Sequence, residues 1–272
     1  MICFPNAKIN LGLNIVSKRE DGYHNIETIF YPIALKDALE VIPSKDRKAY
    51  RLFQTGLDIH SKPEDNLVVK ALNLLAKEKH LPNIDIHLLK TIPYGAGLGG
   101  GSSNGAFMLN LLNQTFALGY NEEELHQFAL KLGADCPFFL KNNPAFATGI
   151  GDEIEELNLS LEDYFIVLVK PDIFISTQEA YNQIVPKQPE ISLKEIVNMP
   201  IEQWHMHLHN DFETPIFKNH PEIEKIKQAL YAKGAIYASM TGSGPSIYGF
   251  FKEKPTISFP NCFVWKNYEQ SL

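Results

Sequence analysis

Cysteine is scarce in this chain of 272 residues, which contains only Cys3, Cys136 and Cys262. Their number is odd, they lie far apart, and no C-x-x-C spacing occurs, so neither a disulfide framework nor a zinc site is expected. The sequence therefore predicts reduced thiols in a reducing compartment.

Long apolar runs and an excess of basic residues are also lacking. No stretch reaches the roughly 18 uncharged apolar residues of a membrane span. The first residues lack a basic region followed by a long apolar run, so no signal peptide is expected. The 25 Lys and Arg residues are outnumbered by 32 Asp and Glu, and nucleic-acid affinity depends on clustered Lys and Arg. We expect a cytoplasmic protein with no membrane or nucleic-acid partner.

The apolar residues that are present suffice for a packed protein. They make up 44% of the chain, and the length is comfortable for two small cores. Alternating apolar residues predict strands at 9–15 and 26–35, and helices and strands alternate after residue 165. The pattern indicates an α+β protein. Residues 158–160 interrupt it, which predicts an N-terminal domain at 1–157 and a C-terminal domain at 158–272.

A glycine-rich segment at residues 95–101 lies between a predicted strand at 84–88 and a predicted helix at 104–118. Gly95, Gly97 and Gly100 match G-x-G-x-x-G. A dinucleotide site would need a strand with an acidic ribose ligand after that helix, but a second helix is predicted from Asn121 instead. No Gly-Lys-Ser/Thr follows the glycines, so a Walker A loop is excluded as well.

The same segment has the properties of a phosphate loop. Glycine allows positive φ and leaves no Cβ in the way, so the N–H groups can surround an anion. A helix that begins near Ser103 adds its dipole and free N–H groups, and Ser102 and Ser103 can bond a phosphate oxygen. A flexible surface loop is the alternative, and the loop alone does not identify ATP.

Three stretches follow one another in a recognisable order: PNAKINLGL at 5–13, PYGAGLGGGSSN at 93–104 and MTGSGPS at 240–246. Together they resemble the GHMP kinase superfamily. DGYH at 21–24 and GADCPFF at 133–139 make the resemblance closest to members that phosphorylate a cytidyl diphosphate polyol in the non-mevalonate isoprenoid pathway. Gly105 and Cys136 depart from the common alanine and valine, and Pro245 removes one N–H from the third stretch.

The resemblance implies a two-domain GHMP kinase fold, with an S5-like N-terminal and a ferredoxin-like C-terminal domain. It implies ATP-dependent phosphorylation of the 2-hydroxyl of the polyol, with Asp135 as the base and Lys8 beside it. An ammonium keeps a nearby carboxylate ionised and stabilises charge on the acceptor oxygen. Spacing alone would favour a solvated lysine at a strand edge and an aspartate that caps a helix.

The resemblance also suggests the binding residues. Tyr23 and His24 would contact the cytosine and Asn10 the polyol, with Thr177 or Tyr181 lining the same cleft. A turn with a half-buried aromatic residue is the alternative for Tyr23 and His24. The ATP-binding residues would be Pro93, Tyr94, Gly95, Ala96, Gly97, Leu98, Gly99, Gly100, Gly101, Ser102 and Ser103, and the third glycine loop would be Thr241, Gly242, Ser243 and Gly244.

Phosphoryl transfer from ATP needs Mg²⁺ to offset the phosphate charge. No protein ligand is identified for it; Ser102 and Ser103 are candidates, and contact through water is equally compatible. A kinase for another alcohol, of the homoserine or mevalonate type, and a non-catalytic ligand sensor on the same fold are the alternatives. We expect a monomer or a weak homodimer.

Overall fold

The computed structural model describes residues 1–46, 48–58 and 62–269. The chain forms two compact units, each built from segments that are distant in sequence. The first unit comprises Met1–Ala7, Ala34–Tyr94 and Gly99–Asn142, and the second comprises Lys8–Ile33, Gly95–Leu98 and Asn143–Leu272. We describe each unit separately.

The first unit contains a four-stranded sheet in the order β1-β4-β6-β5. Its strands are β1 (Ile2–Cys3), β4 (Ala38–Pro43), β5 (Tyr50–Gly56) and β6 (Ile84–Lys90). The β1/β4 and β4/β6 pairs are antiparallel, and β5 runs parallel to β6. In β6, Ile84, Ile86 and Leu88 are buried, and the exposed residues lie between or after them. Residues two apart on a strand point to the same face, so these three place apolar side chains on one face of the sheet.

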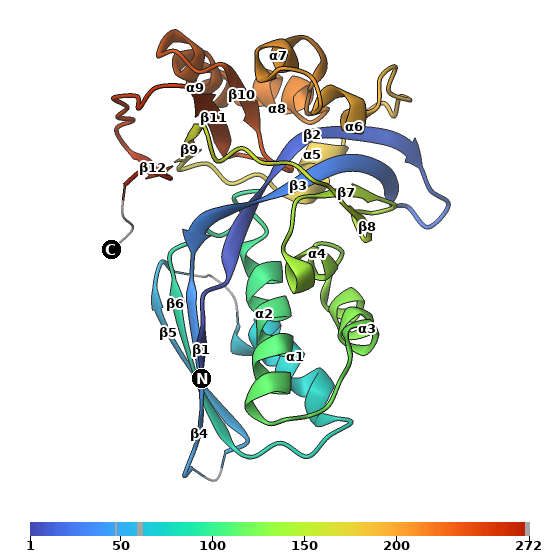
Figure 1. Cartoon of the computed structure of the whole chain (residues 1–272), viewed down its shortest axis with the longest axis vertical. Coiled ribbons are helices and arrows are strands. Elements are labelled where there is room, and N and C mark those ends of the chain that lie inside the picture. The colour runs from blue at the N-terminus through green and yellow to red at the C-terminus, as the bar shows by residue number, and fades with distance from the viewer. Residues whose placement is uncertain (47, 59–61, 270–272) are drawn as a thin grey trace. The chain divides into compact units, whose positions relative to one another are not determined.

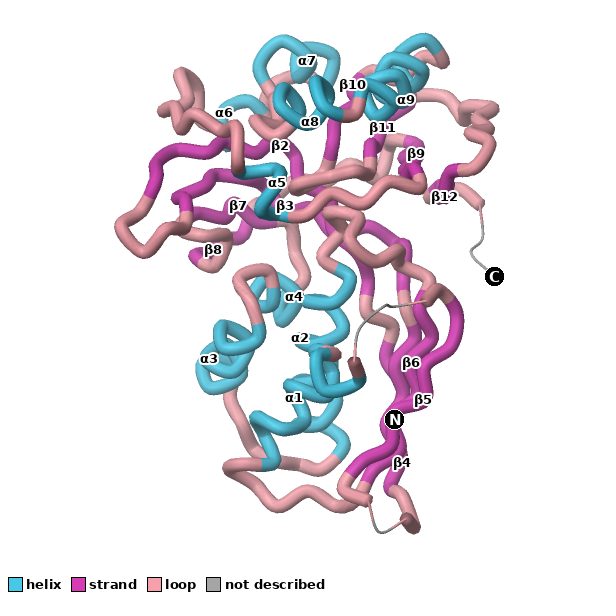
Figure 2. Tube along the Cα trace, turned by 180° about the vertical axis from the view of Figure 1, so that it is seen from behind, coloured by secondary structure: helices cyan, strands magenta, loops and turns pink. Residues whose placement is uncertain are grey.

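Helices cover that face. They are α1 (Leu67–Ala76), preceded by a short 3₁₀ turn at Pro63–Asp65, α2 (Gly100–Thr115), α3 (Glu122–Leu132) and α4 (Cys136–Lys141). α2 packs against the other three, and Figures 1 and 2 show all four on the same side of the sheet. Asn121 and Glu124 form a reciprocal capping box at the start of α3, as its Asn and acidic first turn predicted.

The second unit is built on two sheets. One has the order β2-β3-β7-β8 and the other β10-β11-β9-β12. The strands of the first sheet are β2 (Asn6–Lys18), β3 (His24–Lys36), β7 (Ala145–Thr148) and β8 (Glu153–Glu156). Those of the second are β9 (Phe165–Pro171), β10 (Tyr237–Met240), β11 (Ile247–Phe251) and β12 (Cys262–Lys266), and every pair in it is antiparallel.

Short helices pack on these sheets. They are α5 (Thr177–Tyr181), α6 (Leu193–Ile196), a 3₁₀ turn at Ile201–Gln203, α7 (Trp204–His207), α8 (Glu213–Asn219) and α9 (Pro221–Ala232). α9 contacts β10 and β11, and α7 contacts β10. One buried cluster joins β2, β9, β10, β11, α8 and α9, and includes Ile15, Val167, Ile216, Leu230 and Ile247. β2 is therefore fixed to the core of this unit.

The structure confirms the predicted α+β class and most predicted strands, with one difference near the glycine-rich segment. α2 begins at Gly100, earlier than predicted, because the glycines themselves form its first turn. The two compact units are each discontinuous in sequence, and β7 of the second unit pairs with β3. The division into continuous domains at 157–158 stays a prediction. All three cysteines are free thiols, and burial raises the pKa of Cys136 to about 12. Within the described residues, no helix is long and apolar enough to cross a membrane.

Candidate active site

Lys8 lies on β2 in the second unit, and its side chain is 3% exposed. Its Nζ donates to Asn10 Oδ1 at 2.6 Å and lies 3.4 Å from the carbonyl oxygen of Gly97. The ammonium also lies 4.8 Å from the centre of the Phe30 ring. A buried ammonium requires such polar partners. The ammonium is therefore held in a buried polar network, and the alternative of a solvated strand edge does not hold.

Asn10 holds the ammonium because residues two apart on a strand share a face. Its Nδ2 donates to Thr28 Oγ1 at 2.9 Å, and Thr28 in turn donates to the carbonyl of Gly12 at 2.6 Å. Thr28 belongs to no recognisable motif, and nothing in the sequence distinguished it from other strand threonines. The contact predicted between Asn10 and a polyol remains a prediction.

The first part of the glycine loop and the third glycine loop are in contact within the second unit. Gly97 has φ +74°, and a Cβ added there would lie 2.1 Å from the carbonyl oxygen of Thr241. Thr241 Oγ1 lies 3.1 Å from the Gly97 carbonyl and accepts the backbone N–H of Asn10 at 3.0 Å. Gly242 and Gly244 also have positive φ, and Ser243 lies between them. Within the second unit the structure thus brings Lys8 and Asn10 together with residues 95–98 and the third glycine loop.

The rest of the glycine loop belongs to the first unit and leads into α2. Gly99 is the N-cap of α2 and has φ +67°. Gly100 is the first residue of the helix, and a Cβ added to it would lie 2.7 Å from Ile92 Cγ2. Ser102 and Ser103 lie in the first turn. Ser103 Oγ is buried and makes no hydrogen bond among the described residues. Free first-turn amides and an unsatisfied hydroxyl suit an anion such as a phosphate.

A buried ion pair supports this part of the loop and was missed in the sequence. Lys90 Nζ contacts the carboxylate of Asp37 and donates to Asn104 Oδ1 at 2.9 Å. Asp37 also accepts the backbone N–H groups of Thr91 and Ile92 at 2.7 and 2.9 Å. Burial lowers the pKa of Lys90, and Asp37 opposes that change. The network ties the strand before the loop to the helix after it.

Asp135 occupies the N-cap position of α4 in the first unit and is half-buried. Its side chain accepts no hydrogen bond from the amides of that helix. The carboxylate therefore does not cap α4, the alternative that spacing favoured. Because Lys8 belongs to the second unit, the meeting of Lys8 and Asp135 remains a prediction.

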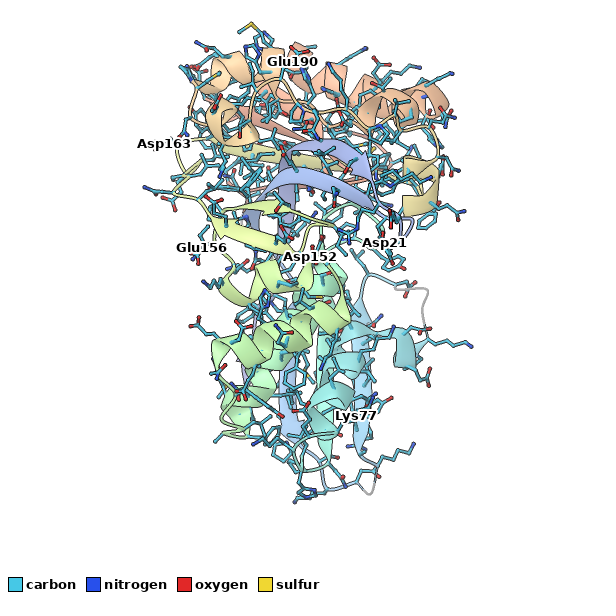
Figure 3. All side chains as sticks on the ribbon, turned by 90° about the vertical axis from the view of Figure 1, so that its right-hand side faces the viewer. Asp21, Lys77, Asp152, Glu156, Asp163 and Glu190 are labelled. Atoms are coloured by element: carbon cyan, nitrogen blue, oxygen red, sulfur yellow. The ribbon has the colours of Figure 1, made fainter. Side chains whose placement is uncertain are left out.

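The residues predicted to contact a nucleobase lie in the second unit. Asp21, labelled in Figure 3, accepts the backbone N–H of Tyr23 at 3.0 Å, and Tyr23 is 62% exposed. The His24 ring stacks on Tyr181, with 4.8 Å between ring centres and 22° between planes. Thr177 is exposed at the start of α5. The Tyr23 ring is exposed, whereas the facing sides of the His24 and Tyr181 rings cover each other. Contact of Tyr23 and His24 with a cytosine stays a prediction.

Two family models match the chain: the GHMP kinases N terminal domain over residues 66–143 and the GHMP kinases C terminal domain over residues 197–258. A 4-diphosphocytidyl-2-C-methyl-D-erythritol kinase of Parabacteroides distasonis is 55% identical over 271 residues, which cover 98% of each chain. One of Bacteroides fragilis is 56% identical over 259 residues, 95% of this chain and 94% of its own. The chain belongs to this family of GHMP kinases.

A solved structure agrees with the family. The crystal structure of a 4-(cytidine 5'-diphospho)-2C-methyl-D-erythritol kinase superimposes with a TM-score of 0.77 at 32% identity, covering 92% of this chain and 89% of that one. The GHMP kinase fold predicted from the motifs is confirmed. The described residues contain no group of three or more His, Cys, Asp or Glu side chains that could hold a metal ion.

Proposed function

We propose that the chain transfers the γ-phosphoryl group of ATP to the 2-hydroxyl of 4-diphosphocytidyl-2-C-methyl-D-erythritol, giving the 2-phosphate and ADP. The observation that carries the proposal is the buried ammonium of Lys8, held by Asn10 beside the glycine loop in a chain of this family. Such a reaction supplies isoprenoid precursors, and we place it in the cytoplasm.

The transfer requires positioning and charge stabilisation more than covalent chemistry. In the proposed reaction the amides of residues 95–102 bind the phosphates, while the amide of Ser103 donates to the Gly99 carbonyl and only its hydroxyl is available. Asp135 accepts the proton of the acceptor hydroxyl, and Lys8 stabilises the charge that develops on its oxygen. Mg²⁺ would accompany the nucleotide and offset phosphate charge, with Ser102 and Ser103 as candidate contacts.

Recognition of the cytosine is assigned to Tyr23, His24 and Tyr181. The rings of His24 and Tyr181 already stack on one another, so one of them must shift or the base must bind at an edge. Tyr181 is held in turn by an edge-to-face contact with Phe212, with 4.8 Å between the ring centres. This arrangement favours a nucleotide-linked acceptor over homoserine or mevalonate, which carry no base.

A comparison of acceptors tests the proposed function. With ATP and Mg²⁺, we expect ADP release with the cytidyl-erythritol substrate and none above background with homoserine or mevalonate. Phosphorus NMR of the product should show a new monophosphate at the 2-position. Activity with homoserine or mevalonate alone would assign a sibling kinase, and nucleotide binding without ADP release from any acceptor would support a ligand sensor.

The pH dependence of substrate binding should report His24. Burial, and secondarily the charge of Lys18, lower the pKa of His24 below its ordinary 6.5. The neutral imidazole, which has both a donor and an acceptor for a base edge, therefore persists as the pH falls to 6.5. We expect the KM for the cytidyl substrate to be constant from pH 8 to 6.5 and to rise only below that.

The His24→Gln variant is the control for this titration, because its amide does not ionise in that range. The KM of this variant for the cytidyl substrate should be higher than that of the wild type and should not rise further below pH 6.5. A rise in the wild-type KM that begins above pH 6.5 would contradict the assignment.

A further inference from the structure

Asn210 is a buried amide in the segment between α7 and α8, with 3% of its surface exposed. Its Nδ2 donates to the carbonyl oxygens of Met240 at 2.8 Å and Gly242 at 2.9 Å. Its Oδ1 accepts the backbone N–H of Phe212 at 3.0 Å. Two carbonyls on one side and an N–H on the other permit only one orientation of the amide. Both N–H groups of the amide are therefore committed, one to the last residue of β10 and one to the third glycine loop.

The two carbonyls that Asn210 holds lie on either side of Thr241. The hydroxyl of Thr241 accepts the backbone N–H of Asn10 at 3.0 Å and lies 3.1 Å from the carbonyl of Gly97. Asn10 Oδ1 in turn lies 2.6 Å from Lys8 Nζ. A continuous set of contacts thus runs from Asn210 through Thr241 and Asn10 to the lysine ammonium.

The segment that carries Asn210 is itself fixed to the strand of Lys8. Leu13 donates to the carbonyl of His209 at 2.8 Å and accepts from the N–H of Asp211 at 2.9 Å. The carboxylate of Asp211 accepts the N–H of Ile15 at 2.7 Å. Asn210 therefore connects two elements, β2 and the third glycine loop, whose relative position determines where the ammonium lies.

We propose that Asn210 is a positioning residue that holds the third glycine loop so that Thr241 and Asn10 keep Lys8 in place for phosphoryl transfer. Its effect on turnover rests on the proposed function. Its effect on the geometry of Asn10 does not, and the two can be measured separately.

The Asn210→Asp variant tests the effect on turnover. It keeps the size of the side chain and the acceptor for Phe212, but it replaces the two N–H donors by an oxygen that faces two carbonyls. We expect kcat to fall about tenfold, equivalent to ~1.4 kcal/mol, with less than a twofold change in the KM of the cytidyl substrate. A kcat within twofold of the wild type would overturn the proposal.

Asn198→Asp is the matched control. Asn198 is exposed and donates to the carbonyl of Lys194 at 2.8 Å, so the same chemical change occurs away from the third glycine loop. This variant should keep wild-type kcat. An equal loss in both variants would overturn the assignment to Asn210.

A double-mutant cycle separates positioning from general destabilisation. Thr241→Val removes the hydroxyl and Thr241→Ser keeps it, so the serine variant should retain most of the kcat that the valine variant loses. If Asn210 acts through Thr241, adding Asn210→Asp to Thr241→Val should cost little more than Thr241→Val alone. Independent, multiplicative losses would overturn the proposed route.

Amide hydrogen exchange at Asn10 provides a readout that needs no activity. Its N–H donates to Thr241, so exchange should be at least about tenfold faster in Asn210→Asp and unchanged in Asn198→Asp. Unchanged exchange at Asn10 in Asn210→Asp would overturn the proposal, whether or not the enzyme is active. If exchange is faster in Asn210→Asp but the wild type shows no kinase activity, only the proposed function is refuted. If Asn210→Asp does not fold, Asn210→Ser leaves room for water at the carbonyls and is measured in the same way.

Discussion

The Asp135→Asn variant is expected to fold and to lose about 10³-fold in kcat. The amide has nearly the same shape as the carboxylate but cannot accept a proton, and a positioned general base typically contributes ~10²–10⁴-fold. The fold should tolerate the change, because the amide keeps the size and shape of the carboxylate and capping of α4 does not depend on this side chain. The affinity for ATP should survive, since backbone amides of the glycine loop are assigned to the phosphates. Steady-state ADP release gives kcat, and calorimetry with a non-hydrolysable ATP analogue gives affinity.

A second aspartate serves as the control. Asp163, labelled in Figure 3, is exposed in the turn before β9, so Asp163→Asn applies the same change outside the proposed chemistry. It should retain wild-type kcat. Near-normal turnover of Asp135→Asn would remove Asp135 from the base role, and a parallel loss of analogue binding would assign it to nucleotide binding instead.

Elements with a strong local pattern were predicted, and elements that depend on tertiary packing were not. The helix predicted from Asn121 is present, and Asn121 caps it ahead of an acidic first turn, both of which are local features of the sequence. No helix was predicted over the six residues of α4, because they are too few to show helical periodicity. α7 was missed for the same reason; it is stabilised by burial of Trp204, which is 1% exposed.

The residues of the candidate site fall into the same two groups, those with a local sequence signal and those that depend on tertiary contacts. Clustered glycines are a local signal, so the glycine-rich segment could be interpreted as a phosphate loop from the residues themselves, whereas Lys8 was named only through the resemblance to the GHMP kinases. Thr28 and Asn210 act only through contacts made after folding, and Thr241 bonds Asn10 across 231 residues of chain. Thr241 was named as part of the third glycine loop, but its bond to Asn10 was not predicted. Thr28 and Asn210 are ordinary polar residues in isolation. Without an observed partner, composition and spacing give no reason to select them.

The Gly97→Ala variant is expected to lose more than about 100-fold in kcat/KM and about 3 kcal/mol of unfolding free energy. The added Cβ would lie 2.1 Å from the backbone oxygen of Thr241, which cannot rotate away as a side chain could. One of the two loops must therefore move by about 1 Å, and a misplacement of that size can cost ~10²-fold. The positive φ adds ~1–2 kcal/mol for any residue with a Cβ. Urea unfolding and ADP-release kinetics measure the two losses.

Gly119→Ala separates the clash from the backbone strain. Gly119 has φ +79°, close to the +74° of Gly97, but a Cβ added there meets no atom within 4 Å. This variant should lose only the ~1–2 kcal/mol that the positive φ costs and should retain its kcat/KM. If the two alanine variants behaved alike, close contact between the loops could not be what restricts position 97 to glycine. Gly97→Ala could instead lose no more unfolding free energy than Gly119→Ala and still lose most of its kcat/KM. That result would show that the loops can move apart at little cost in stability, but that catalysis depends on the distance between them.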